Sequence, residues 1–134
     1  MVDEPISGLP ALPEDVPNER LLPVFVFGHL SDAEFIGQLL EHPVVLEPAQ
    51  LLGYRTAQLA AYDWPILVPD DQETVAGSLC RGVDAEDLRR IDAYHGVGEG
   101  LYRRAAVSLR LGEEGTGSIE EAFAHLPTDR TLRR

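Results

Sequence analysis

Hydrophobic runs along this chain are interrupted by two helix signals. The run from Leu21 to Phe27 is apolar on both faces, which predicts a strand in the middle of a sheet. The stretch 31–34, Ser-Asp-Ala-Glu, has the spacing of a capping box and predicts the start of a helix that Pro43 ends. One face of that helix carries an apolar stripe formed by Phe35, Ile36, Leu39 and Leu40.

The rest of the chain is dominated by strand patterns. A second helix begins at Asp84, whose side chain can cap it, and Gly96 lies just after its end. An acidic loop precedes the strand that starts at Thr74, and the stretch from Ile119 to His125 is ambiguous. The other strand material lies at 44–46, 49–55, 58–61, 66–69, 74–83 and 105–111.

The order of elements predicts the fold class. Because it lacks the regular alternation of a doubly wound parallel sheet, we expect an α+β fold: a small, mostly antiparallel mixed β-barrel flanked by two main helices. A length of 134 residues suits one domain. Residues 1–20 are acidic and rich in proline, which predicts an extended or disordered lead-in. Residues 21–128 then form the domain, and 129–134 form a basic tail.

The composition is strongly acidic and contains no lysine. The 11 basic residues are all arginine, and with 23 acidic residues the net charge is −12. Schiff-base chemistry and a lysine base are thereby excluded, and the acidity argues against nucleic acid and anionic membranes as partners. No apolar run approaches the roughly 18 residues of a membrane span, and the N-terminus lacks the basic start of a signal peptide. We therefore expect a cytoplasmic location.

Cysteine and histidine usage gives no sign of a metal site. Cys80 stands alone, which excludes an internal disulfide and a cysteine metal cluster. Its strand setting predicts a small buried apolar group. Because His29, His42, His95 and His125 are scattered without metal-ligand spacing, we expect no metal ion.

Two distant segments carry the candidate chemistry. In Phe27-Gly28-His29-Leu30 a strand breaks at a glycine before a helix, so its backbone N–H groups can receive a carboxylate or a developing oxyanion. The simpler alternative is a plain turn with His29 on the surface. His95 ends the second helix and can exchange a proton near neutral pH, although a histidine there also suits the helix dipole.

Two further side chains lie close to these segments in the sequence. Glu99 stands among the three glycines of 96–100, where a carboxylate is either solvated or a base on a lid. Strand alternation places Tyr102 and Arg104 on one face and Arg103 on the other. We expect one arginine to pair with a carboxylate and the tyrosine hydroxyl to line a cavity.

Taken together, these segments resemble the γ-glutamylcyclotransferase-like superfamily, which includes AIG2-like and γ-glutamylamine cyclotransferase proteins. The resemblance runs from about Pro23 to about Leu126 and rests on order and spacing rather than on one motif. The segments that carry it are Phe-Gly-His-Leu at 27–30, Gly-Tyr-Arg at 53–55, Trp-Pro-Ile-Leu-Val-Pro at 64–69, Val-Ala-Gly-Ser-Leu at 75–79, Ile-Asp-Ala-Tyr-His-Gly at 91–96 and Leu-Tyr-Arg-Arg at 101–104.

The resemblance implies a small barrel flanked by helices, with a cavity between the loop and the helix end, and a reaction that needs no cofactor. Such enzymes cyclise a γ-glutamyl group: the α-amine attacks the γ-carbonyl, 5-oxoproline forms and an amine leaves. A base must first take a proton from the α-ammonium. Carried over to this chain, the substrate-binding residues are Phe27, Gly28, His29, Leu30 and Tyr102.

The chain departs from the family pattern where the family has its catalytic glutamate. His95 occupies that position, Phe27 replaces the loop's tyrosine, His29 replaces its small hydroxyl residue, and His125 replaces a tyrosine of the last strand. A neutral imidazole can accept a proton, but it does not hold a cationic amine by charge.

Three hypotheses therefore stand. The chain is an active transferase- or lyase-type enzyme with His95 as base and Glu99 in reserve. Alternatively, it has lost this chemistry and binds a small anionic metabolite or a protein partner. In the third hypothesis, a His29–His95 pair performs a different reaction. Where the ligand is a small molecule, we expect it to bear a carboxylate, and the sequence leaves the oligomeric state open.

Overall fold

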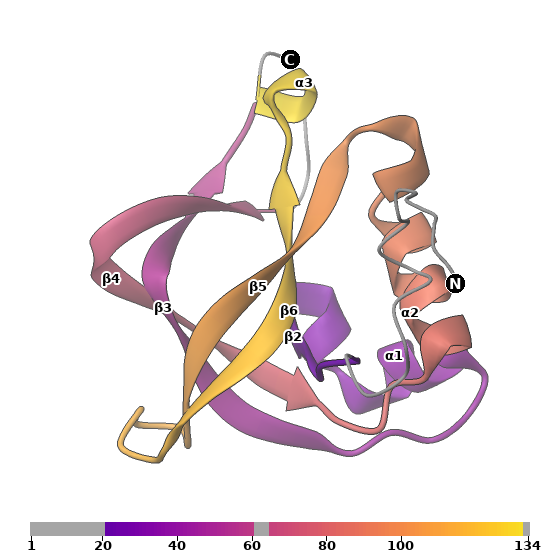
Figure 1. The fold of residues 1–134 in the computed structure, drawn as a ribbon, viewed down its shortest axis with the longest axis horizontal. Coiled ribbons are helices and arrows are strands. Elements are labelled where there is room, and N and C mark those ends of the chain that lie inside the picture. The colour runs from indigo at the N-terminus through magenta and orange to yellow at the C-terminus, as the bar shows by residue number, and fades with distance from the viewer. Residues whose placement is uncertain (1–20, 61–64, 133–134) are drawn as a thin grey trace, which may run out of the picture.

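The computed structural model describes residues 21–60 and 65–132, and its centre is a closed barrel of strands in the order β2-β4-β3-β5-β6 (Figure 1). β2 lies antiparallel to β4 and parallel to β6, whereas the other pairings of described strands are antiparallel. The expected mixed barrel is therefore confirmed. The strands span Val24–Val26 (β2), Leu46–Gln58 (β3), Pro65–Cys80 (β4), Tyr102–Leu111 (β5) and Ile119–Pro127 (β6).

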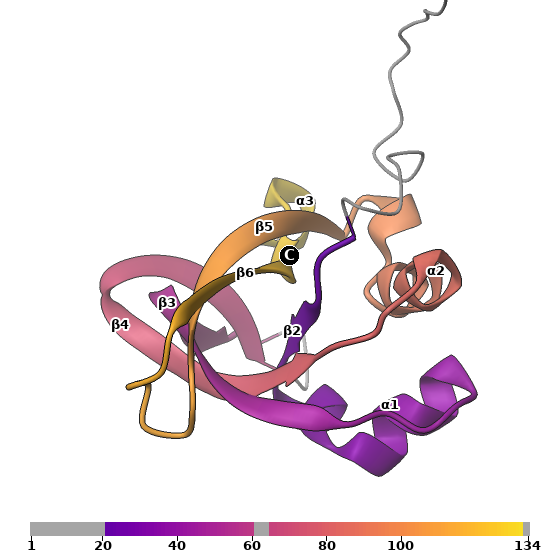
Figure 2. The same cartoon turned by 60° about the horizontal axis from the view of Figure 1, so that its bottom comes forward.

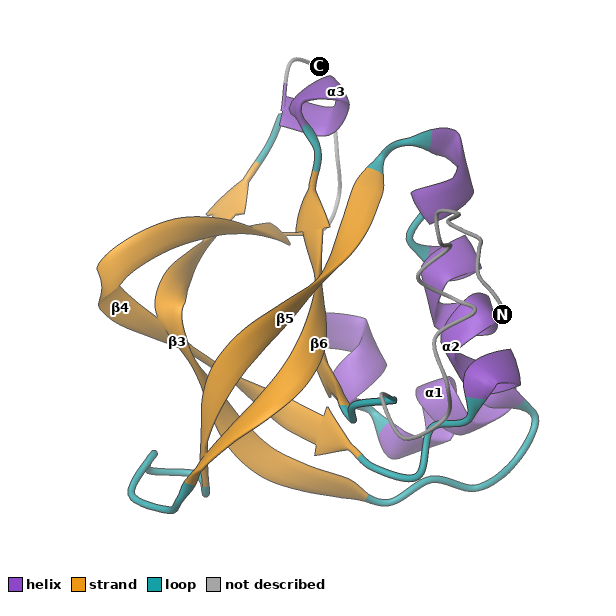
Figure 3. Cartoon of the chain, in the orientation of Figure 1, coloured by secondary structure: helices purple, strands orange, loops and turns teal. Residues whose placement is uncertain are grey.

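Two main helices flank the barrel, as expected, and Figures 2 and 3 show them on the same side of it. The 3-10 turn η3 (Gly28–Ser31) joins β2 to α1 (Ala33–Leu40). α2 (Ala85–Tyr94) follows β4 and leads through the 3-10 turn η4 (Val97–Glu99) into β5. This connectivity places the loop after β2 and the end of α2 at the helical flank of the barrel.

β2 separates two apolar cores because successive side chains of a strand point to opposite faces. Phe25 belongs to the core inside the barrel, whereas Val24 and Val26 belong to a second core under the helices. All three residues are buried, which confirms the expectation of a central strand that is apolar on both faces. The regular strand is shorter than the predicted run from Leu21 to Phe27.

Gly77 allows β2 to pack closely against β4. A Cβ at this position would lie 2.5 Å from the carbonyl oxygen of Val26 and 2.6 Å from the ring of Phe25. Both atoms belong to a buried strand that cannot move aside, so a side chain here would separate the two strands. The closure of the barrel next to η3 therefore depends on this glycine.

The strands β3 and β4 form one long antiparallel ribbon, where the sequence suggested several short strands. The acidic stretch 70–73, expected as a loop, lies within β4. It is accommodated by a register shift, because Leu52 pairs with Thr74 and Tyr54 pairs with Pro69. The four residues 70–73 of β4 therefore lie opposite the single residue Gly53 of β3. Gly53 has φ +84°, a conformation that glycine adopts without strain. The predicted turn at 62–65 falls mostly outside the described residues.

The helix ends follow from local hydrogen bonds. Asp32, rather than the predicted Ser31, caps α1 by accepting from the Glu34 N–H, because Ser31 already closes η3 through a bond to the Gly28 carbonyl. The capping-box prediction at 31–34 is therefore wrong, and the cap of α1 lies one residue later, at Asp32. At α2 the Asp84 cap is confirmed.

The last third of the chain is more regular than the sequence suggested. The ambiguous stretch from Ile119 is part of β6, and residues 129–132 of the predicted basic tail form α3 (Asp129–Leu132). The proposed lead-in 1–20 lies outside the described residues. No helix in the described ranges is long and apolar enough to cross a membrane.

The hairpin β5–β6 presents two different faces. Its inward residues pack in the barrel core, whereas the alternate residues lie on the opposite face, part of which contacts α2. The inward set comprises Ala105, Val107, Leu109, Ala122, Ala124 and Leu126. Tyr102 and Arg104 lie on the other face of β5, and Arg103 is exposed. The face toward α2 also carries His125, which pairs in register with Arg104.

Candidate functional site

The loop after β2 is a tight 3-10 turn. Gly28 has φ +66°, and the Ser31 hydroxyl donates to the Gly28 carbonyl over 2.7 Å. The first N–H groups of such a turn have no hydrogen-bond partner inside it. The N–H groups of Gly28, His29 and Leu30 can therefore donate to a ligand. The Leu30 side chain is buried under the helices, and only its backbone is available to a ligand. The turn expected after β2 is therefore present, and its role in receiving an anion stays a prediction.

The end of α2 fixes His95. The residue is the C-cap, and Gly96 follows with φ +69°, as the sequence predicted. The Nδ1 atom of His95 lies 2.9 Å from the carbonyl oxygen of Ile91. Because a carbonyl only accepts, Nδ1 carries the hydrogen and Nε2 carries the lone pair. The local backbone therefore selects one tautomer of this imidazole.

The surroundings of His95 keep it neutral. Its ring stacks on the ring of His125, with centroids 4.1 Å apart and planes within 9°. Tyr94 and Tyr102 approach it edge-on, each with centroids 5.4 Å away. Burial, with a smaller contribution from His125, lowers the pKa of His95 from 6.5 to about 4. At pH 7 this residue is a neutral hydrogen-bond partner.

A charged network stands behind the two stacked imidazoles. Asp92 of α2 accepts from the Nε2 atom of His125 over 2.8 Å and from Arg104 over 2.5 Å. The three side chains are 19%, 3% and 13% exposed, respectively. The expected arginine–carboxylate pair is thus Arg104 with Asp92. This network binds α2 to the outer face of β5–β6 and orients His125 against His95.

A series of ring contacts connects the two predicted segments. The exposed ring of His29 lies 6.3 Å from Phe35 of α1, which in turn lies 5.9 Å from Tyr94. Tyr94 then contacts His95. The turn and the helix end are therefore linked through two intervening aromatic rings. Phe27, another predicted site residue, turns away from them and stacks on Phe25 at the barrel core.

Glu99 is exposed, but its loop is held by hydrogen bonds. Gly96 accepts from the N–H groups of Glu99 and Leu101, and the Glu99 carbonyl accepts from Arg130 over 2.9 Å. The Thr128 hydroxyl donates to the Gly100 carbonyl. These bonds favour the solvated carboxylate over the base on a lid. The Oε1 atom nevertheless lies beside Gly96, 3.1 Å from where a Cβ would stand.

Two surface hollows lie away from these residues. One of about 670 Å³ is formed by 21–23 and 81–86, and one of about 400 Å³ lies along α1 and the chain after it. Neither is lined by His95. The cavity expected between the loop and the helix end is therefore not one of these two hollows.

The other sequence expectations about chemistry concern Cys80 and metals. Cys80 is fully buried, and desolvation raises its pKa to about 11, so it is a packed thiol as predicted. Within the described residues, no group of three or more histidine, cysteine or acidic side chains is placed to hold a metal ion.

Sequence reasoning missed Asp92 and the ring pair Phe35–Tyr94. Asp92 stands three positions before His95, so the two residues share one face of the helix. The partners of Asp92, Arg104 and His125, are brought together by the pairing of β5 with β6. Phe35 belongs to the predicted apolar stripe of α1, yet it is 38% exposed.

Comparisons with known proteins agree on one group of relatives. The chain is 29% identical over 86 residues to AIG2-like protein A of Arabidopsis thaliana, which covers 64% of this chain and 50% of the relative. AIG2-like protein C of the same plant is 27% identical over 88 residues. It covers 66% of this chain and 49% of the relative, so this chain spans about half the length of the curated relatives it matches.

Solved structures show the same fold. A protein of Arabidopsis thaliana solved in solution matches with a TM-score of 0.70 at 22% identity, covering 81% of this chain and 63% of that one. A structure described as gamma-glutamyl cyclotransferase matches with a TM-score of 0.63 at 16% identity, covering 80% and 66%. The family model for gamma-glutamyl cyclotransferase, AIG2-like, matches residues 24–133. This chain therefore belongs to the AIG2-like gamma-glutamyl cyclotransferase family.

Proposed function

We propose that this chain is a catalytically altered member of its family. It binds a small carboxylate-bearing ligand of the γ-glutamyl class at the η3 turn and does not cyclise it to 5-oxoproline at an enzymatic rate. The observation that carries the proposal is the state of His95, which stands at the family's glutamate position as a stacked, neutral imidazole. A cytoplasmic location belongs to the same proposal.

Burial affects a glutamate and a histidine in opposite ways. A desolvated carboxyl has a raised pKa, which makes the carboxylate a better proton acceptor, whereas a desolvated imidazole has a lowered pKa and becomes a poorer one. At His95 the pKa has fallen to about 4. An α-amine with a pKa of about 8 then keeps its proton in preference to this ring. The replacement therefore weakens the step that must precede attack on the γ-carbonyl.

Charge supports the same conclusion. A carboxylate at position 95 would hold the substrate's ammonium by an ion pair, but a neutral imidazole offers only a hydrogen bond. Asp92, the nearby carboxylate, is already paired with Arg104 and His125. The Asp92 carboxylate is therefore not free to hold the cationic end of an amino-acid substrate.

The turn η3 retains the means to receive the anionic end of a ligand. Its first N–H groups lie where the chain leaves β2, and N–H groups at the start of a helical turn bind carboxylates well. His29 lies exposed in the same turn and adds a donor. These features favour a ligand with a terminal carboxylate and a small polar body.

A turnover assay tests the loss of chemistry. The full chain is incubated with a panel of γ-glutamyl amides and amines, and 5-oxoproline is measured for wild type, His95→Glu and His95→Gln. We expect no product from wild type above the uncatalysed rate. If wild type releases 5-oxoproline and His95→Gln abolishes this activity, the proposal is wrong.

A binding experiment tests the retained site. Backbone amide signals are followed by NMR while glutarate or a γ-glutamyl amide is added, with the amine-only analogue as a control. We expect the signals of 28–30 to shift with the carboxylate compounds and not with the amine. Binding without shifts in this turn, or no binding at millimolar concentration, contradicts the proposed ligand site.

Glu99 gives a second candidate function a specific basis. Its Oε1 atom lies beside Gly96, the residue after His95. In this alternative, Glu99 takes the ammonium proton, His95 accepts a hydrogen bond and Tyr102 lines the site, so the chain remains a slow cyclotransferase. The same assay distinguishes the two functions, because Glu99→Gln would then abolish product while the exposed control Glu113→Gln would not.

A further inference from the structure

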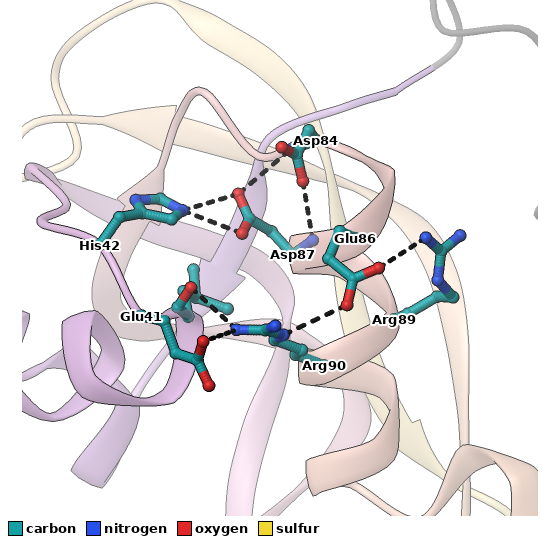
Figure 4. Close-up of polar contacts among 8 residues, drawn as sticks. Glu41, His42, Asp84, Glu86, Asp87, Arg89 and Arg90 are labelled. Carbon is teal, nitrogen blue, oxygen red and sulfur yellow. Dashed lines mark hydrogen bonds and ion pairs between the residues drawn. The ribbon is translucent and has the colours of Figure 1, made fainter.

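A histidine outside the candidate site joins the two main helices. His42 follows α1, and its ring has a hydrogen-bond partner on each side. Figure 4 shows the bonds to Asp87. Its Nδ1 atom lies 2.9 Å from the Pro43 carbonyl oxygen, and its Nε2 atom lies 2.9 and 3.0 Å from the two carboxylate oxygens of Asp87 in α2. A carbonyl and a carboxylate are both acceptors, so both ring nitrogens must donate. This geometry belongs to the imidazolium ion.

Asp87 is a fixed anion that requires such a partner. Its side chain is 5% exposed, and it forms a reciprocal capping box with Asp84 at the start of α2. The Asp84 carboxylate accepts from the Asp87 N–H over 2.8 Å, and the Asp87 carboxylate faces the Asp84 N–H at 3.3 Å. The helix cap therefore fixes the carboxylate in place, and a buried charge of this kind is costly without a cation.

His42 is the cation that pairs with Asp87, because the nearby Arg90 has other partners. Arg90 pairs with Glu41 over 3.2 Å and with Glu86 over 3.4 Å, and it donates to the Leu40 carbonyl. The titratable groups that face the pair from the packed elements are Asp84 at the start of α2 and the buried thiol of Cys80 in β4. The Asp84 carboxylate favours the charged imidazole.

The pair lies at one end of an antiparallel helix contact. At the other end, Phe35 in the first turn of α1 packs edge-on against Tyr94, the last residue of α2. η3 directly precedes α1, so the position of this helix also sets the position of the turn. A contact that holds α1 against α2 at the far end therefore contributes to the geometry of the turn.

We propose that His42 is a pH-sensitive latch between α1 and α2, closed by the imidazolium–Asp87 ion pair and weakened when the ring loses its proton. A neutral ring retains one N–H. This N–H can still donate to Asp87. The Nδ1 atom then presents a lone pair to the Pro43 carbonyl oxygen, so the hydrogen bond between His42 and Pro43 is lost. The charge-assisted bond also becomes a weaker neutral one.

The direction of the pH effect follows from the same contacts. The Pro43 carbonyl and the Asp87 carboxylate raise the pKa of His42 above its ordinary value of 6.5. The folded protein therefore holds this proton more tightly than the unfolded chain does. The stabilisation is complete below about pH 6.5 and is lost as the pH rises through the raised value. The latch opens on the alkaline side.

Amide hydrogen exchange of the full chain tests the latch. Protection factors, which are corrected for intrinsic exchange, are measured for 33–40 between pH 6 and pH 9 in wild type, His42→Gln and the distant exposed control Glu113→Gln. Glutamine at position 42 can donate to Asp87 but cannot become charged. We expect protection of α1 to fall about threefold to tenfold in wild type and in Glu113→Gln, and to be independent of pH in His42→Gln.

A second measurement keeps the proposal falsifiable if His42→Gln alters the packing. The imidazole signals of His42 are titrated by NMR in wild type and in Asp87→Asn, which retains a capping oxygen. We expect the titration midpoint to move to lower pH in Asp87→Asn. An unchanged midpoint, or an equal alkaline loss of protection in wild type and His42→Gln, overturns the latch.

Discussion

At the scale of single residues, the environment gives two histidines opposite properties. His42 stands at the surface between two oxygen acceptors, and these raise its pKa. His95 stands in a stack of rings where burial lowers its pKa to about 4. The side chain is the same, but one becomes a cation that links two helices and the other a neutral hydrogen-bond partner. Their contributions to stability consequently depend on pH with opposite sign.

The buried imidazole should make the protein sensitive to acid. As the pH falls below 6.5, the unfolded chain binds a proton at His95, whereas the folded chain binds it only near pH 4. The contribution of His95 is therefore present at neutral pH and lost on the acid side. Between pH 7 and pH 4.5 we expect a loss of about 2 kcal/mol from this residue.

The measurement compares the free energy of unfolding in urea for wild type and His95→Gln across this range. Glutamine does not titrate, so the difference between the two proteins should shrink by about 2 kcal/mol toward pH 4.5. His29→Gln, at an exposed position, serves as the control and should leave the pH dependence unchanged. If the difference in free energy of unfolding between wild type and His95→Gln does not change with pH, the His95 ring is accessible to solvent and has an ordinary pKa.

At the scale of elements, α2 is fastened to β5–β6 by one ion pair. Asp92 and Arg104 are both largely buried, and Asp92 also receives the His125 N–H. Breaking a buried pair by removing one charge costs more than the pair contributes, since the other charge remains buried alone. Asp92→Asn should therefore destabilise the protein by about 2–3 kcal/mol.

A double-mutant cycle in urea checks this expectation. Arg104→Met removes the stranded cation, so Asp92→Asn should cost much less in that background, with a coupling energy of about 1–3 kcal/mol. Asp71→Asn on the exposed part of β4 is the matched control and should stay within about 0.5 kcal/mol of wild type. Additive effects of Asp92→Asn and Arg104→Met would contradict an energetic pair.

The elements that local signals predict best are the helices and the central strand. The cap at Asp84, the glycine after His95 and the apolar run through Phe25 are each explained by a few neighbouring residues. The acidic stretch 70–73 was misjudged because its place in β4 depends on the partner strand and on a register shift opposite Gly53. The register in which β3 pairs with β4 is not visible in the local pattern of residues 70–73.

The candidate site was predictable only in part for the same reason. His95 and the η3 turn were found from their local setting and from the family resemblance. Their connection through Phe35 and Tyr94, and the network around Asp92, require the packing of two helices and a hairpin. No spacing in the chain encodes which carboxylate meets Arg104, although strand alternation correctly placed Arg104 beside Tyr102.

At the scale of the whole molecule, net charge opposes folding. A charge of −12 on 134 residues creates mutual repulsion that is strongest in the compact state. Exposed ion pairs such as Arg81 with Glu47 and Glu120 act in the other direction. Each exposed pair contributes at most about 1 kcal/mol, so the general repulsion should dominate.

Added salt should therefore stabilise this protein. Salt screens both terms, but repulsion among many distant charges is screened most strongly, because the Debye length falls to about 8 Å at 0.15 M. We expect the free energy of unfolding in urea, an uncharged denaturant, to rise by about 1 kcal/mol from 0.01 M to 0.3 M sodium chloride at pH 7.5. Arg81→Gln removes the main competing pairs and should steepen this rise. A fall in stability with salt would mean that the specific ion pairs outweigh the net charge.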